Sequence, residues 1–393
     1  MSKTQELPVN PSVLEWARKT AGLPIPLAAQ ELGITAEYLI DIESGRKPSK
    51  TLLRNMTRVY KRSFTVLLLP EPPIEDNIPT DYRTLPIPKR LIGQETADAV
   101  REARRLQEAL SDLAYDTPDI FPVFQCSAVV FKDDPDKVAT QIRQIVSVDI
   151  AEQKKWPSLD YAFRQWRGKL QKLGILVIIE SFPREEARGF SLWHPDAIPT
   201  IVVSRNEAPS AQIFTLFHEL AHICIHSDAM CLKQETTTLQ GNVEAWCNRV
   251  AAAILVPKND LQQLIDKTSV KQYSLEELYR IASKYKVSRH VIAIRLEHLG
   301  YAPKGYYNNI KTELDPDDYI QRAISRRNKQ QEYRRNIPQE RLAEVGFTAT
   351  NAILEACRNS VLSTIEAADL LRVRPAKFNR LHDLASAQSQ RYG

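Results

Sequence analysis

Three of the seven histidines in this chain, His218, His222 and His226, fall within one short phrase, FTLFHELAHICIH. The phrase contains His-Glu-x-x-His at residues 218–222. Residues four apart on a helix lie on the same face, about one turn apart, so the imidazoles of His218 and His222 can reach a single ion. Imidazole pairs at this spacing are typical ligands of Zn²⁺. The spacing therefore predicts a zinc site on a helix.

Glu219 lies between the two histidines and offers a carboxylate beside the ion rather than a ligand. Zinc lowers the pKa of a bound water to about 7, so a nearby carboxylate can accept its proton at neutral pH. Two imidazoles with an adjacent base are typical of a zinc hydrolase. The alternative hypothesis is a chance pentapeptide in which both histidines are core residues with satisfied hydrogen bonds.

Two candidates for the third ligand fit poorly. His226 follows His218 by eight positions, a rise of about 12 Å on a straight helix, so the two cannot share one ion. Asp228 holds the third-ligand position of the longer pattern H-E-x-x-H-x-x-G-x-x-H, but Ile225 replaces the glycine of that pattern. A β-branched residue resists the left-handed turn that this glycine makes, which disfavours Asp228.

Glu244 is the third ligand that we predict. It lies in NVEAWCNRVAAAILVP, on the next expected helix, and a carboxylate from a second helix completes a His₂Glu set with an open fourth position. Asn248 shares the helix face of Glu244, and Ala251 and Ala252 would let the two helices approach. The alternative for Glu244 is an ordinary exposed acid.

Strands and helices must position these residues. The apolar run GILVIIESF at 174–182 predicts a strand, with IPTIVVS at 198–204 as its partner. We expect helices near 210–226 and 242–255 to carry the metal ligands, and Pro257 to end the second. Further helices are expected at 94–116, near 135–147 and 158–173, and as a pair over 274–300.

The histidine phrase, followed by E-x-x-x-N-R-V-A-A-A-I-L-V-P, resembles the ImmA/IrrE family of zinc-dependent peptidases over residues 94 to about 300. The resemblance implies a zincin-like metallopeptidase domain with a small sheet. It implies that His218, His222 and Glu244 bind zinc and that Glu219 is the catalytic base. It further suggests GFSLWH at 189–194 or TIVVS at 200–204 as an edge to which an extended peptide adds a strand.

Residues 11–62 read as four or five short helices, and Ala29, Gly33 and Leu39 have the spacing of a helix-turn-helix. The following LPEPP and PTDYRT segments resemble the connector that joins such peptidases to an N-terminal helix-turn-helix of the Xre repressor type. The second helix of this motif is acidic, whereas residues 46–62 carry seven basic residues and no acid. The residues that we predict to contact DNA are Thr35, Tyr38, Arg46, Lys47 and Lys50. The alternative is a solvated basic helix of an interaction module.

These features predict four parts: a helix-turn-helix domain at 1–68, a linker with six prolines at 69–92, a metallopeptidase domain at 93–310, and a C-terminal helical module at 311–393. The module contains a second helix-turn-helix-like phrase, TIEAADLLRVRPAKFNRL at 364–381. This phrase lacks a clear turn glycine, and we interpret it as a structural or partner-binding cap. The basic run 322–335 could touch nucleic acid or an acidic partner.

Composition narrows the fold class. Only 12 of 393 residues are glycine, about half the usual share, which favours a helix-rich protein; we predict an α+β, predominantly α-helical fold. The net charge of +5 means that a nucleic-acid site must be a local patch. No apolar run approaches the ~18 residues of a membrane span, residues 1–10 lack a signal-peptide core, and the five cysteines form no C-x-x-C pair. We expect a cytoplasmic protein.

Together these observations predict an intracellular regulator. Its zinc peptidase would cleave a regulatory partner of the repressor or antitoxin type, and its helix-turn-helix would bind DNA. No membrane partner is expected, and a homodimer is compatible with the sequence. The alternative is a non-catalytic antitoxin or transcriptional regulator that binds operator DNA and a partner toxin.

Overall fold

The computed structural model describes residues 9–21, 23–60, 62, 66–72, 93–117, 121–124, 129–183, 186–226, 237–265, 272–314 and 336–392. Most of the expected linker, residues 73–92, and the basic run 322–335 lie outside these ranges. The chain forms two compact units, one of Met1–Thr80 with Thr84–Glu102, the other of Asp81–Arg83 with Ala103–Gly393. Our four-part division at 68, 92 and 310 stays a prediction.

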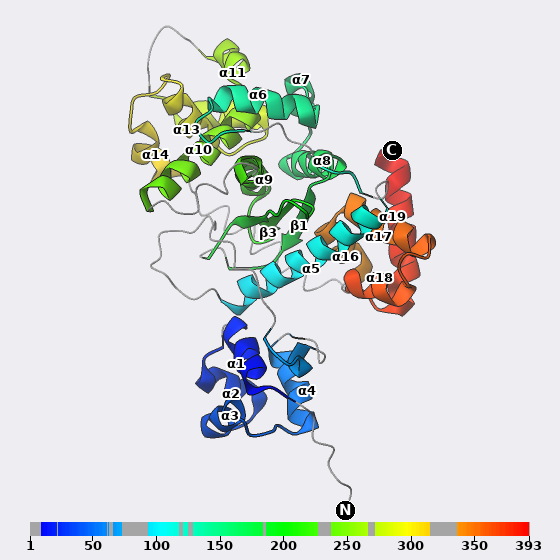
Figure 1. Cartoon of the computed structure of the whole chain (residues 1–393). Helices are drawn as coiled ribbons and strands as arrows, with labels where there is room; N and C mark the ends of the chain where they lie inside the picture. Colours follow the sequence, from blue (N-terminus) through cyan, green and yellow to red (C-terminus); the bar gives the residue numbers. More distant parts are fainter. Residues whose placement is uncertain are drawn as a thin grey trace, which may run out of the picture. The chain divides into compact units, whose positions relative to one another are not determined.

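Four short helices and a 3₁₀ turn form the first unit: α1 Pro11–Thr20, α2 Ile25–Leu32, α3 Ala36–Glu43, α4 Lys50–Val59 and η1 Val66–Leu68 (Figure 1). Asn10 caps α1, and the Thr35 side chain accepts a hydrogen bond from the Tyr38 amide at the start of α3. Gly33, at φ 69°, ends α2 in the left-handed region. Leucine, isoleucine and alanine side chains from all four helices form the core.

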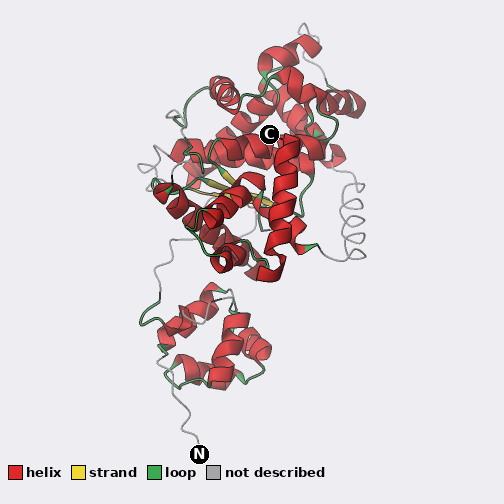
Figure 2. Cartoon of the chain, turned by 90° about the vertical axis from the view of Figure 1, so that its right-hand side faces the viewer, coloured by secondary structure: helices red, strands yellow, loops and turns green. Residues whose placement is uncertain are grey.

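Helices make up most of the second unit and surround its three strands (Figure 2). The helices are α5 Gln94–Asp116, which begins in the first unit, α6 Pro135–Val146, α7 Ile150–Lys155, α8 Leu159–Lys172, α9 Pro209–His226, α10 Thr237–Leu255, α11 Lys258–Leu264, α12 Leu275–Tyr285, α13 Arg289–His298, α14 Tyr306–Leu314, α16 Ile337–Val345, α17 Phe347–Arg358, α18 Thr364–Leu370 and α19 Pro375–Tyr392. The mostly helical chain with one small sheet agrees with the predicted α+β class. Among the described residues, no helix combines the length and apolar character needed to cross a bilayer.

The sheet has the strand order β1-β3-β2, with β1 Leu176–Glu180, β2 Gly189–Leu192 and β3 Thr200–Ser204. β1 and β3 pair, as the two apolar runs predicted, and their pairing is parallel, whereas β2 pairs antiparallel with β3. β3 therefore lies in the middle of the sheet. The expectation that TIVVS could accept an added strand is wrong, because both edges of β3 are already paired. β2 is an edge strand, and all four of its residues are buried.

The helices after residue 336 pack against the sheet and against α8 of the second unit. α16 contacts β1, and α17 contacts α8. The buried Arg167 of α8 donates hydrogen bonds to the carbonyl oxygens of Val177 in β1 and of Ala343 and Glu344 in α16. Burial lowers the pKa of Arg167 to about 9, so the guanidinium stays charged at neutral pH. One side chain thus joins a strand to a helix more than 160 residues later in the chain.

Candidate metal centre

The helix α9 carries the His-Glu-x-x-His motif through the core of the second unit. It packs against β2, β3, α8 and α10 (Figure 1), and Phe217 meets Trp166 of α8 edge to face at 4.8 Å. His218, Glu219 and His222 are 0–1% exposed. Buried polar side chains are costly unless they are paired, so three in one helix indicate a site rather than packing alone.

α10 brings Glu244 to the two histidines. Its Ala251 and Ala252 are buried, as the small-residue pattern suggested. The Glu244 carboxylate lies 3.1 Å from His218 Nε2 and 3.2 Å from His222 Nε2, and the two Nε2 atoms are 3.1 Å apart. One ligand atom from each residue falls within 4.8 Å of the other two. The structure therefore brings together all three residues that we predicted as ligands.

This donor set fits zinc. Tetrahedral zinc with ligands at about 2.0–2.1 Å places neighbouring ligand atoms roughly 3.3 Å apart, close to the separations found here. Two imidazole nitrogens and one carboxylate oxygen are the set of a catalytic site that leaves a fourth position open. Glu244 is the most accessible of the three, and its side chain is 30% exposed.

Asn248 sets the tautomer of His218. Its Oδ1 lies 3.1 Å from His218 Nδ1. An amide oxygen only accepts hydrogen bonds, so Nδ1 carries the proton and Nε2 keeps its lone pair toward the site. Asn248 is one turn beyond Glu244 on α10, as the sequence indicated. One helix thus supplies one candidate ligand and the group that orients another.

The charges at the site favour a cation. Burial alone would raise the pKa of Glu244, but the adjacent side chains of His218 and His222 outweigh it and lower this pKa well below its usual range. The carboxylate is therefore ionised at neutral pH. Burial raises the pKa of the neighbouring Cys247 thiol, which keeps it neutral beside the ring of His222. Glu244 is thus the anionic member of the candidate ligand set.

Ser191 is a site residue that the sequence did not reveal. Its Oγ donates a hydrogen bond of 3.0 Å to Glu219 Oε2, and Ser191 is 9% exposed in β2. β2 can lie this close to α9 because Gly189 has no side chain: a Cβ there would meet Thr215 Cγ2 at 2.3 Å. The only signal in the sequence was a lone serine within the apolar phrase GFSLWH.

The residues predicted to contact DNA lie in the first unit, around the start of α3 and the loop before α4. Arg46 stacks on the Tyr38 ring at 4.5 Å and pairs with Asp41 at 3.3 Å. Lys47 and Lys50 are exposed, and Thr35 caps α3. Two side chains of the basic stretch, those of residues 58 and 61, lie outside the description. DNA contact by this set stays a prediction.

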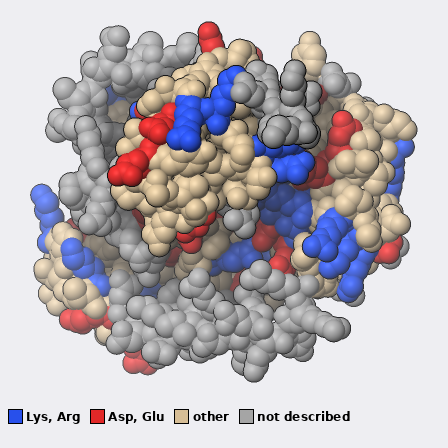
Figure 3. Space-filling view, turned by 90° about the horizontal axis from the view of Figure 1, so that it is seen from below, with Lys and Arg blue, Asp and Glu red and all other residues tan. Residues whose placement is uncertain are grey.

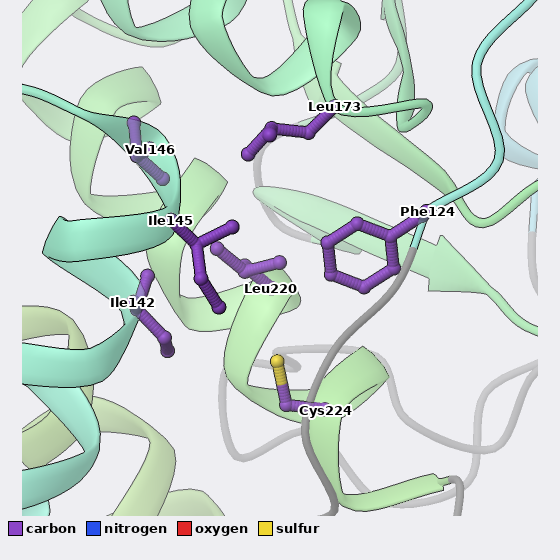
Figure 4. A pocket seen from close by; sticks show the side chains of 7 residues that line it. All are labelled: Phe124, Ile142, Ile145, Val146, Leu173, Leu220 and Cys224. Atoms are coloured by element: carbon purple, nitrogen blue, oxygen red, sulfur yellow. The ribbon is translucent and has the colours of Figure 1, made fainter.

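A small apolar cavity lies beside α9 (Figure 4). Leu220 and Cys224 of α9 face three residues of α6 across it, and its volume is about 10 Å³. A cavity of this size holds about one water molecule, but an apolar lining gives that water no partner. The cavity is therefore a packing defect and not a substrate site.

In a comparison with known proteins, one family model matches this region of the chain. Residues 170–297 match the IrrE N-terminal-like domain of the Peptidase M78 family. The matched segment contains the sheet, α9 and α10, and therefore all three candidate ligands and Glu219. It starts after both the N-terminal helices and α5 and ends before the C-terminal helices.

A solved structure of a Mycobacterium tuberculosis transcriptional regulator is similar to this chain at 18% identity and a TM-score of 0.31. The likeness covers 49% of this chain and 51% of that protein, so the chain spans about half of the regulator's length. A comparison with curated proteins found no match.

Proposed function

We propose that this chain is a zinc-dependent endopeptidase that cleaves a regulatory partner protein. The observation that carries the proposal is the convergence of His218, His222 and Glu244 next to a buried Glu219. The M78 match over the same residues supports it. A purely structural zinc site has no use for a carboxylate base held beside it.

Each residue has a role in this proposal. His218, His222 and Glu244 would hold Zn²⁺, which when bound supplies Lewis-acid chemistry by polarising a carbonyl and acidifying water. Glu219 would take the proton of the attacking water and return it to the leaving amine. The Ser191 hydroxyl holds Oε2 of that carboxylate, which fixes the direction in which the base faces.

The substrate in this proposal is a protein segment of the repressor or antitoxin type that can lie extended near β2. The helix-turn-helix of residues 1–68 would bind DNA, with Thr35 and Tyr38 near bases and with Arg46, Lys47 and Lys50 at phosphates. Exposure of the three basic side chains supports this assignment.

The substitution Glu219→Gln tests the proposal. It removes the proton acceptor but keeps all three ligands, so zinc content should stay near one ion per chain. Cleavage should fall by a factor of about 10²–10⁴, the usual contribution of a general base. The measurements are metal analysis of the purified chain and cleavage of proteins co-expressed from neighbouring genes.

His222→Ala is the matched variant, since it should lose both zinc and cleavage. A chain that binds no zinc, or whose Glu219→Gln form regulates and cleaves like the wild type, would refute the peptidase and favour a scaffold that binds operator DNA and a partner.

A further inference from the structure

The turn between α2 and α3 has a defined geometry. Gly33 is left-handed, and its amide donates to the Gln30 carbonyl oxygen at 3.1 Å. The next amide, of Ile34, donates to the Ala29 carbonyl oxygen at 3.0 Å. Such a turn directs the second helix of a helix-turn-helix away from the first. The apolar residue just after the left-handed one, Ile34, is partly buried against the core.

The same turn recurs in the C-terminal helices, 339 residues later. α18 begins at Thr364 as α2 begins at Ile25, and α19 begins at Pro375 as α3 begins at Ala36. Arg372, at φ 47°, takes the place of Gly33. Its amide donates to the Asp369 carbonyl oxygen at 2.9 Å, and the amide of Val373 to that of Ala368 at 2.9 Å, the same two bonds in the same register.

The apolar positions coincide as well. The buried residues of the second motif are Ala367, Ala368, Leu371, Val373, Phe378 and Leu381. Each stands 339 residues after an apolar residue of the first, namely Ala28, Ala29, Leu32, Ile34, Leu39 and Ile42. The missing turn glycine therefore does not argue against this motif, because Arg372 adopts the left-handed conformation itself. α18 and α19 form a second helix-turn-helix.

A third copy of the turn joins α12 to α13. Lys286 is left-handed there, at φ 57°, and the Val287 amide donates to the Ala282 carbonyl oxygen at 3.1 Å. α13 is buried, however: Ile292 and Arg295 are both 0% exposed, and the helix packs on α10, α12 and α14. Only His298 of α13 is exposed, so this second helix offers no broad exposed face for a DNA groove.

The exposed surfaces of α3 and α19 differ in charge. α3 shows Glu37, Ile40 and Asp41 to solvent. In α19 the corresponding positions hold Ala376, Asn379 and Arg380. Arg374 and Lys377 stand where the first motif has Thr35 and Tyr38.

Arg374, Lys377 and Arg380 are exposed, and none of them forms an ion pair with a side chain in the described part of the chain. The exposed acids closest in sequence are Glu366 and Asp369 on α18 and Asp383 further along α19. On the face shown in Figure 3, both basic and acidic side chains are exposed.

We propose that α19 is a DNA-recognition helix, which enters the major groove of double-stranded DNA and contacts it through Arg374, Lys377 and Arg380. A helix-turn-helix presents the first turns of its second helix to base edges, and basic residues there neutralise phosphates. This site is independent of the metal centre and adds a DNA contact to the one proposed for residues 1–68.

The test uses the full-length, zinc-loaded chain and a fluorescent DNA duplex of about 20 base pairs and mixed sequence, about two helical turns. Anisotropy titrations over a salt series give the dissociation constant and its salt slope. The double variant Lys377→Ala/Arg380→Ala should bind at least about tenfold more weakly, with a salt slope smaller by about 2. Lys377→Arg/Arg380→Lys should restore binding.

Arg280→Ala/Lys284→Ala is the matched control, since it removes the same charge from the exposed face of α12 and should leave binding unchanged. The proposal is overturned if the wild type does not bind the duplex, or if the α19 variant binds like the wild type. It is also overturned if binding is lost only in Lys47→Ala/Lys50→Ala, or if RNA or polyglutamate competes as well as DNA. Melting temperatures verify that each variant is folded.

Discussion

At the scale of single residues, the geometry of the candidate metal centre depends on side chains other than the three candidate ligands. Asn248 holds His218 in the tautomer that directs Nε2 to the site, and Ser191 holds Glu219. Both partners lie on other elements than α9, on α10 and β2. The orientation of the His-Glu-x-x-His residues is therefore a property of the packed unit rather than of the helix alone.

Replacing Asn248 with alanine should weaken zinc binding by a factor of about 10–100, because His218 loses the acceptor for its Nδ1 proton. Competition with a chromophoric chelator measures the affinity. Asn248→Asp keeps an acceptor at the same place and should retain most of it. Equal affinities for wild type and Asn248→Ala would show that the 3.1 Å contact does not orient the ring.

Replacing Ser191 with alanine should slow cleavage by about tenfold, since a hydrogen bond of this kind contributes about 1–1.5 kcal/mol. Zinc content should not change, because Ser191 contacts the base and no ligand. Ser191→Thr keeps the hydroxyl and should recover the rate. Loss of zinc in Ser191→Ala would assign the serine to the integrity of the site instead.

At the scale of elements, the distance between β2 and α9 decides whether Ser191 reaches Glu219. Gly189→Ala would place a Cβ 2.3 Å from Thr215 Cγ2 and 2.7 Å from the Val202 carbonyl oxygen, closer than real contacts allow. We expect a loss of about 1–3 kcal/mol in the free energy of unfolding, measured in urea.

Gly168 is the matched position for this test. It lies inside α8, and a Cβ there meets nothing within 4 Å. Gly168→Ala should therefore leave stability unchanged or raise it by about 0.5–1 kcal/mol through helix propensity. If both alanines had the same effect, the tight approach of β2 to α9 would not be a constraint.

Most of the helices and strands could be predicted, because each follows from the spacing of apolar residues within one short segment. The helix over 94–116 and the strand runs around β1 and β3 occur where their patterns placed them. α7 was missed, since six residues are too few to show a period. The third candidate ligand, Glu244, was predicted from residue type and spacing, and it lies beside the two histidines.

Contacts between elements that are far apart in the sequence could not be predicted. The hydrogen bond from Ser191 depends on β2 lying beside α9, and no local pattern encodes that approach. The left-handed turn between α18 and α19 was missed for a related reason. A left-handed φ is usually predicted where the sequence has a glycine. Arg372 adopts this conformation because the buried residues on both sides hold the turn.

At the scale of the whole molecule, the helices after residue 336 are bound into the second unit by buried polar contacts. Arg167 and Gln171 of α8 donate to carbonyl oxygens in α16, and Gly346 packs on both, with no room for a Cβ. These contacts leave unsatisfied buried groups if the C-terminal helices are removed.

A chain that ends at residue 335 should therefore be destabilised by several kcal/mol, at about 1–3 kcal/mol for each buried donor left unpaired. Thermal unfolding and limited proteolysis measure the effect. Removal of residues 1–68 is the control, because they belong to the other compact unit and the melting of the second unit should change little. An unchanged melting temperature in the C-terminal truncation would show that these helices are an independent module.

The division of the ligands between two helices has a mechanical consequence. An ion held by His222 and Glu244 would tie together positions 22 residues apart and close a loop between them. Such a tie restricts the unfolded chain much as a disulfide does, and a loop of this size corresponds to about 3 kcal/mol. The supply of metal in the cell would then govern the lifetime of the folded protein as well as the proposed cleavage activity.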